Sequence, residues 1–219
     1  MKPGAYGQEV VLVGRQQIPG RLAHQFLLSA DILPAEYDWQ VVAEVPSPLL
    51  ARLSYANGID IAVSPDRCAI VYGAFADRAL AAEQRDALLG ELASRYVAAF
   101  PQVQFTAVGL NLDMIMDQAR EVVWSWLLCR ADAWDFGGSP TLARQLRQQC
   151  RIDNALLTVA IVDVRAEYPG QAVERVRVSA NCHHELKETL TVDSLSGLLV
   201  RFPDYRKKLE SWFEEVTGV

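Results

Sequence analysis

The chain has 219 residues, of which 51% are hydrophobic and 22% are charged, and its formal net charge is -6. This composition is that of an ordered globular protein with one large domain or two small ones, and it excludes a disordered chain. Neither half of the chain is basic, so a nucleic-acid partner is not expected. No apolar run follows Met1–Gly4 as in a secretory signal, and none is long enough to span a membrane, so we expect a cytoplasmic protein without a membrane partner.

The first fifty residues predict short strands separated by turns. Glu9–Gly14 is rich in valine and favours a buried strand. Gln25–Ile32 is predicted as a second strand, although it also fits the beginning of a helix, and Tyr37–Val45 carries a weaker strand pattern. Turns are expected at Ile18–Gly20 and Pro46–Pro48.

The segment Arg52–Leu112 gives the clearest prediction. Asn57-Gly58 lies between two apolar runs and predicts a hairpin with a type I′ turn, because both residues tolerate positive φ. Cys68–Phe75 is apolar enough for the centre of a sheet. These runs indicate a strand meander at the start of the segment.

A long helix is predicted over residues 77–100, with Asp77 as its cap, and a return strand is predicted over 103–112. Pro101 ends the helix. Its apolar residues recur at helical spacing and include Leu89, Ala93, Tyr96 and Phe100. This spacing predicts that the helix packs one face across the sheet.

The rest of the chain predicts a second group of strands and helices. In chain order we expect a helix over 117–130, a linker over 131–141, a helix over Thr141–Cys150, strands over Asn154–Ala166 and Gln171–Ala180, and helices over Asp193–Val200 and Pro203–Val216. The expected fold class is α+β, with mainly antiparallel sheets and amphipathic helices packed on one face. The order of hairpin and helix in residues 1–130 and 142–219 leaves open one domain or two similar halves.

Cys182, His183, His184 and Glu185 are adjacent in the sequence and carry groups that bind zinc. A metal site here would favour a metal-binding protein or an enzyme. Adjacent side chains of a strand point to opposite faces, however, so the two histidines would not reach one ion. An exposed strand end or loop is the competing interpretation.

A cysteine nucleophile is a second catalytic hypothesis, with Cys182 as the thiol and His24 as a remote base. Cys129 and Cys150 lie on the apolar sides of predicted helices, which indicates buried, unreactive thiols. No C-x-x-C pair is present, and reduced cysteines are expected in a protein that is not secreted.

A glycine-rich loop within residues 131–141 is a candidate small-ligand site. Its candidate ligand-binding residues are Trp134, Asp135 and Ser139. The alternative is an interdomain linker with helix caps.

Arg144, Arg147 and Arg151 fall on one side of the helix predicted over Thr141–Cys150. Such a basic stripe either binds an acidic partner or phosphate, or forms a solvated face. Arg206–Lys208 presents the same choice near the C-terminus.

We expect a non-catalytic binding or scaffold protein that self-associates or binds a protein partner. The chain contains no common phosphate-binding or hydrolase motif and has 3 histidines. Its helical patterns carry many aromatic residues, which favours self-association. These residues are Trp124, Trp126, Tyr205, Trp212 and Phe213. The alternatives are an enzyme or metal-binding protein using Cys182–Glu185, and a small-ligand binder using Trp134–Ser139.

The position of a site is a separate prediction. Asp60, Arg67 and Asn111 form no group in the sequence, so Arg52–Leu112 is expected to serve folding alone. A functional site is expected in the segments 131–141 and 181–188, which have less regular patterns.

Overall fold

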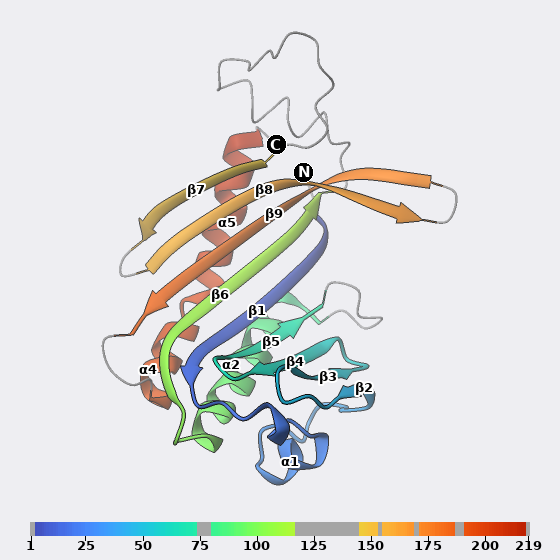
Figure 1. The fold of residues 1–219 in the computed structure, drawn as a ribbon. Helices are drawn as coiled ribbons and strands as arrows, with labels where there is room; N and C mark the ends of the chain where they lie inside the picture. The colour runs from blue at the N-terminus through green and yellow to red at the C-terminus, as the bar shows by residue number, and fades with distance from the viewer. Residues whose placement is uncertain are drawn as a thin grey trace.

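The computed structural model describes residues 3–73, 80–116, 145–152, 155–168, 171–186 and 191–217. Its nine described strands form one antiparallel sheet in the order β2-β3-β4-β5-β1-β6-β9-β8-β7 (Figure 1). The predicted α+β class with a mainly antiparallel sheet is therefore confirmed. Strands from both parts of the chain belong to this sheet, because β6 pairs with β9.

Along the chain, the described elements form a strand-rich first part, then a second group of strands, then two final helices. The strands are β1 (Pro3–Arg15), β2 (Val41–Val45), β3 (Ala51–Tyr55), β4 (Ile59–Ser64), β5 (Arg67–Tyr72), β6 (Gln104–Met116), β7 (Gln145–Ile152), β8 (Ala155–Tyr168) and β9 (Gln171–Glu185). The helices are α1 (His24–Ser29), α2 (Ala82–Ala99), α4 (Val192–Leu199) and α5 (Phe202–Thr217), with a short 3-10 helix at Pro19–Arg21. The hairpin of β8 and β9 and the two C-terminal helices agree with the prediction.

The β3–β4 hairpin is confirmed, but its predicted type I′ turn is wrong. Gly58 has a φ of 87°, whereas Asn57 does not have a positive φ. The amide of Gly58 donates to the carbonyl of Tyr55 at 3.0 Å, which closes a three-residue loop with one left-handed glycine. Such a loop needs positive φ only at Gly58, and the side chain of Asn57 instead accepts a bond from the amide of Ile59 at 3.1 Å.

The strand predicted over Gln25–Ile32 is wrong, because this segment forms helix α1. Leu27 is buried while Leu28 and Ser29 are both exposed, so the burial does not alternate as the strand prediction required. The helix ends where Asp31 adopts a φ of 53°. The amide of Ile32 then donates to the carbonyl of Leu27 at 2.9 Å, and that of Asp31 to Leu28 at 3.1 Å, a pattern typical of a helix C-terminus.

Helix α2 packs through the apolar stripe that the sequence predicts. Leu89, Ala93, Tyr96 and Phe100 are all buried, and α2 contacts β1 and β5. The helix begins at Ala82 rather than at residue 77, and the proposed cap Asp77 lies outside the described residues.

The helix predicted over Thr141–Cys150 is wrong for the residues that are described, because Gln145–Cys150 belong to strand β7. Leu146 and Cys150 are four residues apart, a spacing that also places two side chains on the same side of a strand. Pairing with β8 along eight positions decides between the two structures. The helix predicted over 117–130 and the linker over 131–141 lie outside the described residues.

The strand registers divide the central side chains between two sides of the sheet. Val10, Leu110 and Cys182 are opposed across β1, β6 and β9, and all three are buried. Helix α5 packs against this side, where the ring of Tyr205 lies 5.8 Å from that of His184. We call it the helix side.

The other side of the same strands carries hydrophilic residues and is called the polar side. It begins one residue along each strand, at Glu9, Asn111 and Asn181, which are again directly opposed. The alternation of apolar and polar residues in β6 and β9 therefore assigns each residue type to one side.

Candidate functional site

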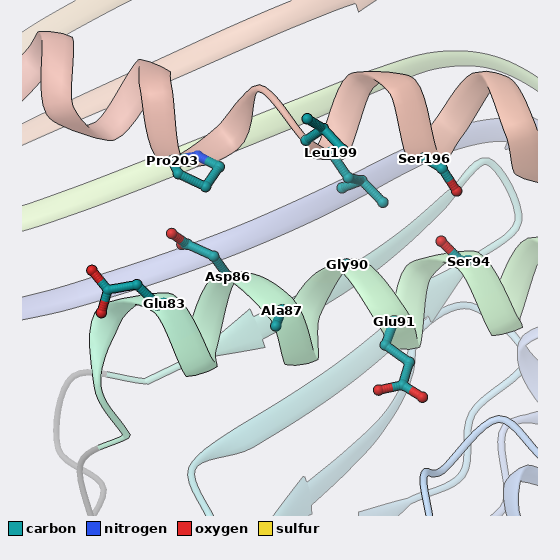
Figure 2. A pocket seen from close by; sticks show the side chains of 10 residues that line it. Glu83, Asp86, Ala87, Gly90, Glu91, Ser94, Ser196, Leu199 and Pro203 are labelled. Carbon is teal, nitrogen blue, oxygen red and sulfur yellow. The ribbon is translucent and has the colours of Figure 1, made fainter.

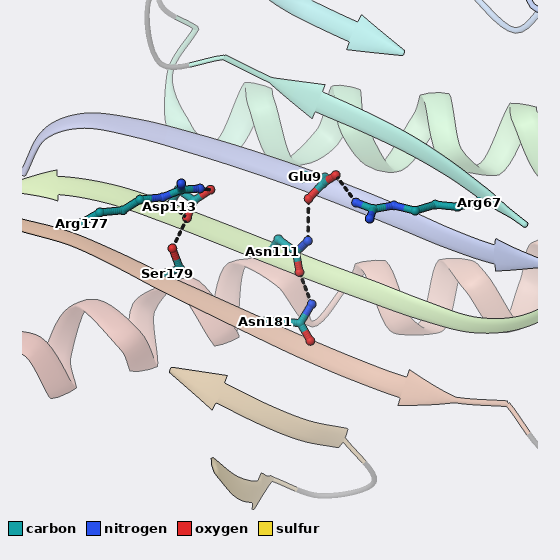
Figure 3. A network of polar contacts seen from close by, with 7 residues as sticks. All are labelled: Glu9, Arg67, Asn111, Asp113, Arg177, Ser179 and Asn181. Carbon is teal, nitrogen blue, oxygen red and sulfur yellow. Dashed lines mark hydrogen bonds and ion pairs between the residues drawn. The ribbon is translucent and has the colours of Figure 1, made fainter. Parts of the chain in front are cut away.

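A row of polar side chains crosses five adjacent strands on the polar side. Its members, directly opposed from β1 to β7, are Glu9, Asn111, Asn181, Thr158 and Gln149. Asn111 donates to Glu9 at 2.5 Å, and Asn181 donates to Asn111 (Figure 3). Gln149 donates to Thr158 at 3.1 Å. We call this set the polar row.

The two carboxylates of this network, Glu9 and Asp113, are each paired with an arginine. Arg67 of β5 donates to Glu9 at 2.9 Å. Asp113, in the row beside the polar row, accepts two bonds from Arg177 at 3.0 and 2.5 Å and a third from Ser179 (Figure 3). Within each ion pair the two charges neutralise each other, and the charge-assisted hydrogen bonds hold the carboxylates in fixed positions.

The residue types in this network are unusual for the centre of a sheet. Asparagine and aspartate are depleted in strands, where β-branched and aromatic residues are favoured. Asn111 and Asp113 nevertheless lie on β6 and Asn181 on β9, both with strands on either side. A local rule of strand composition that is broken at several neighbouring positions is characteristic of a functional surface.

Above this network lies a hollow of about 300 Å³. Its lining includes Asn111, Asp113 and Asn181, together with Gln145 and Arg147 from the outer strand β7. Gly109, in the row on the other side of the polar row, has no side chain above the sheet, and a Cβ there would lie 3.5 Å from the amide nitrogen of Asn181. The hollow therefore presents amide, hydroxyl, carboxylate and guanidinium groups together.

The positive charge that remains in this region comes from β7. Arg147 lines the hollow, and Arg151 lies on the same side of the strand four residues later. Both are exposed, and neither forms an ion pair with any residue that the structure describes. The basic stripe proposed from the sequence thus persists on a strand, while Arg144 lies outside the described residues.

The structure separates the four residues predicted as a zinc site. Cys182 and His184 lie on the helix side of β9 and are buried, with His184 opposed to Val108. His183 lies on the polar side, between Gly109 and Leu156, and Glu185 is exposed at the strand end. Strand β9 is regular to Glu185, so alternation divides the set, and the described part of the chain holds no group of three candidate metal ligands.

The thiols that the structure describes differ in exposure. Burial raises the pKa of the Cys68 thiol to about 12 and that of Cys182 to about 11, which disfavours the nucleophilic thiolate. Cys150 is exposed on β7 rather than buried as predicted. His24 lies 3.3 Å from the hydroxyl of Tyr55, far in the fold from β9.

The predicted small-ligand residues Trp134, Asp135 and Ser139 lie outside the described residues, as does Cys129. The expectation that Asp60, Arg67 and Asn111 belong to no group is wrong for two of these residues. Arg67 and Asn111 belong to the network with Glu9, which is 102 positions from Asn111 in the sequence. A local signal for this network exists in the alternation Leu110–Met114, where Asn111 and Asp113 separate apolar residues.

A groove of about 370 Å³ lies between α2 and the pair α4 and α5 (Figure 2). Leu199 and Pro203 form its apolar wall, opposite Gly90 of α2. Asp86 lies at its base and accepts a bond from Gln8 of β1 at 2.8 Å, while Arg206 of α5 lies 3.5 Å from the second oxygen of Asp86. This buried ion pair joins α2, the sheet and α5, and we assign it a structural role.

Exposed apolar side chains gather near the other edge of the sheet. Val42 and Val45 of β2 are 67% and 52% exposed, and Leu49 just after the strand is 75% exposed. A shallow hollow nearby is lined by Ile18 and Pro46. Exposed apolar patches are typical of protein contacts, so this edge is a second candidate for a partner.

No protein-family model, curated protein or solved structure matches the chain. None of the helices that the structure describes is long and apolar enough to cross a membrane. The fold and the network therefore define the chain only as an α+β protein with one antiparallel sheet and a polar hollow on it.

Proposed function

We propose that this chain is a non-catalytic binding protein of the cytoplasm that recognises an acidic protein segment on the polar side of its sheet. The observation that carries the proposal is the positive charge of Arg147 and Arg151, which form no ion pair with a described residue, beside a hollow whose other charged residues are paired with each other or with Arg67. An acidic segment would pair with these guanidinium groups and use the amides of the polar row as hydrogen-bond partners.

The arrangement of helices supports this proposal. In it, α2, α4 and α5 cover the helix side together, as the sequence prediction of helices on one face requires. The contacts of α2 with β1, α4 and α5, and the contact of Tyr205 with His184 on the helix side, support this arrangement. The polar side then remains free of these helices and available to a partner. The proposal does not require the two halves of the chain to be similar.

Binding to poly-L-glutamate tests the proposal with a defined acidic peptide. We expect binding at low salt, and we expect Arg147→Gln combined with Arg151→Gln to weaken it by about tenfold or more, since each charge-assisted hydrogen bond contributes about 1.5–3 kcal/mol. Fluorescence titration measures both affinities. The matched control is Lys207→Gln with Lys208→Gln, which removes the same charge from exposed positions on α5. Absence of binding, or equal losses in both variants, would overturn the proposal.

A second prediction separates function from stability at the polar row. Replacing both Asn111 and Asn181 by valine should leave the free energy of unfolding within about 1 kcal/mol of its original value or raise it, because valine is favoured in central strands and in cross-strand pairs. Urea unfolding measures the change. Leu110→Ala, one position away on the helix side, is the control and should cost about 2–5 kcal/mol. A loss of similar size in the valine variant would assign the asparagines to folding instead.

A further inference from the structure

Strand β7 has a regular outer edge. It pairs with β8 at eight consecutive positions without a register shift, and no described strand pairs with its other edge. Its side chains from Gln145 to Arg151 are all exposed. The outward amide and carbonyl groups of such a strand are a template for pairing with another strand.

The other edge of the sheet lacks this regularity. Strand β2 has five residues, its register shifts between Val41 and Ala43, and Pro46 follows it directly. Short length, a bulge and proline all protect an edge against pairing. Strand β7 has none of these three features, so strand pairing favours the β7 edge.

The sequence of β7 is self-complementary in one register. In an antiparallel pair centred on Gln148, Leu146 lies opposite the partner's Cys150 on the helix side. Arg147 then lies opposite the partner's Gln149 on the polar side. The same contacts occur twice, as a two-fold axis requires. Leu146 is 45% exposed in the single chain, and its apolar surface would be covered in this pair.

Neighbouring registers are less favourable. Centring the pair on Arg147 places that arginine opposite its own copy, and centring it on Gln149 places Arg147 opposite the partner's Arg151. Like charges directly opposite each other destabilise a strand pair. A centre between two residues would place helix-side residues opposite polar-side residues and interrupt both sides.

We propose that two copies of the chain pair through β7, centred on Gln148, and form one continuous antiparallel sheet. The polar sides of the two copies then form one continuous surface. Arg147 and Arg151 lie beside the partner's Arg147 and the partner's Arg151 along the line where the two β7 strands meet, which we call the seam. Because this seam is the basic part of the proposed acidic-segment site, the inference rests on the proposed function. The partner copy completes the site by doubling its positive charge.

Disulfide trapping tests the register in the full chain. Gln148→Cys with Cys150→Ser should form a covalent dimer on mild oxidation, because directly opposed residues have Cβ atoms about 4.5–5.5 Å apart, close to the separation a disulfide needs. The control is Gln102→Cys with Cys150→Ser, which places a thiol on an exposed turn after α2. Non-reducing electrophoresis and sedimentation of the original chain measure covalent and reversible dimers.

The outcomes separate this inference from the proposed function. Trapping at position 148 well above the control, with a dimer in the sedimentation series, supports the seam. Equal trapping in both variants, or a monomer throughout the series, overturns it even if poly-L-glutamate still binds. Loss of poly-L-glutamate binding with efficient trapping would overturn the proposed function and leave the dimer standing. Because four arginines line the seam, added salt should strengthen the dimer by screening their repulsion.

Discussion

Replacing Leu92 by alanine is expected to lower the free energy of unfolding by about 3 kcal/mol. Leu92 is fully buried on α2, within the cluster that also contains Leu88, Leu89 and Tyr96. The substitution removes apolar contacts and leaves a cavity that neighbouring side chains fill only in part. Because α2 contacts β1 and β5, this loss acts on the packing of helix against sheet rather than on the helix alone.

Urea unfolding measures this loss, and an unchanged dependence on urea concentration would show that the unfolded state is not altered. Ser94→Ala is the control on the same helix, since Ser94 lines the groove instead of the buried stripe. We expect its effect to remain within about 0.5 kcal/mol. A loss below about 1 kcal/mol for Leu92→Ala would contradict the packing of α2 described above.

Local periodicity explains which elements could be predicted from the sequence. The apolar residues Ile59, Ile61 and Val63 alternate strictly, so only the period of a strand fits this segment. The apolar stripe of α2 repeats over several turns, so only the period of a helix fits that segment. One wrong prediction lies where the spacing of apolar residues fits both a helix and a strand, as at Leu146 and Cys150. Another lies where a short helix ends at a residue with positive φ, as at Asp31.

The candidate site was harder to predict, because pairing between distant strands creates it. Asn111 meets Glu9 and Asn181 only through β1–β6 and β6–β9 pairing. The alternation in β6 assigns Asn111 to one side of a strand but gives no information about the strand beside it. The Cys182–Glu185 group shows the opposite case, in which adjacency in sequence becomes separation across the sheet.

Removal of one partner from the buried pair of Asp86 and Arg206 should be the most destabilising change considered, at about 3–5 kcal/mol. The side chains of Asp86 and Arg206 are 6% and 8% exposed, so removing either one would leave the other charge buried without this ion pair. Asp86→Ala and Arg206→Ala test the two directions. Glu83→Ala is the matched control, because Glu83 lies 3.8 Å from the same guanidinium group but is 80% exposed. Its effect should stay within about 0.5 kcal/mol.

Replacing both partners together should cost much less than the two single changes. Burial raises the pKa of Asp86 despite the opposing effects of Arg206 and the hydrogen bond from Gln8, so the cost of removing the carboxylate from water exceeds their attraction. Asp86→Leu with Arg206→Met should therefore come within about 1 kcal/mol of the original stability. If the loss of unfolding free energy in the double variant equalled the sum of the two single losses, the energies of the two side chains would be independent of each other, which would contradict this prediction.

The pH dependence follows from the same shift. Because the folded pKa of Asp86 is raised, the folded state binds more protons than the unfolded state between the unfolded value, about 3.9, and the folded one. Stability relative to the double variant should thus be greatest below this interval and decrease as the pH rises through it. Urea unfolding of both proteins across acidic pH measures the difference. An increase over the same interval would show that Arg206 lowers the pKa of Asp86 more than burial raises it, and that the ion pair stabilises the contact between α5 and the sheet at neutral pH.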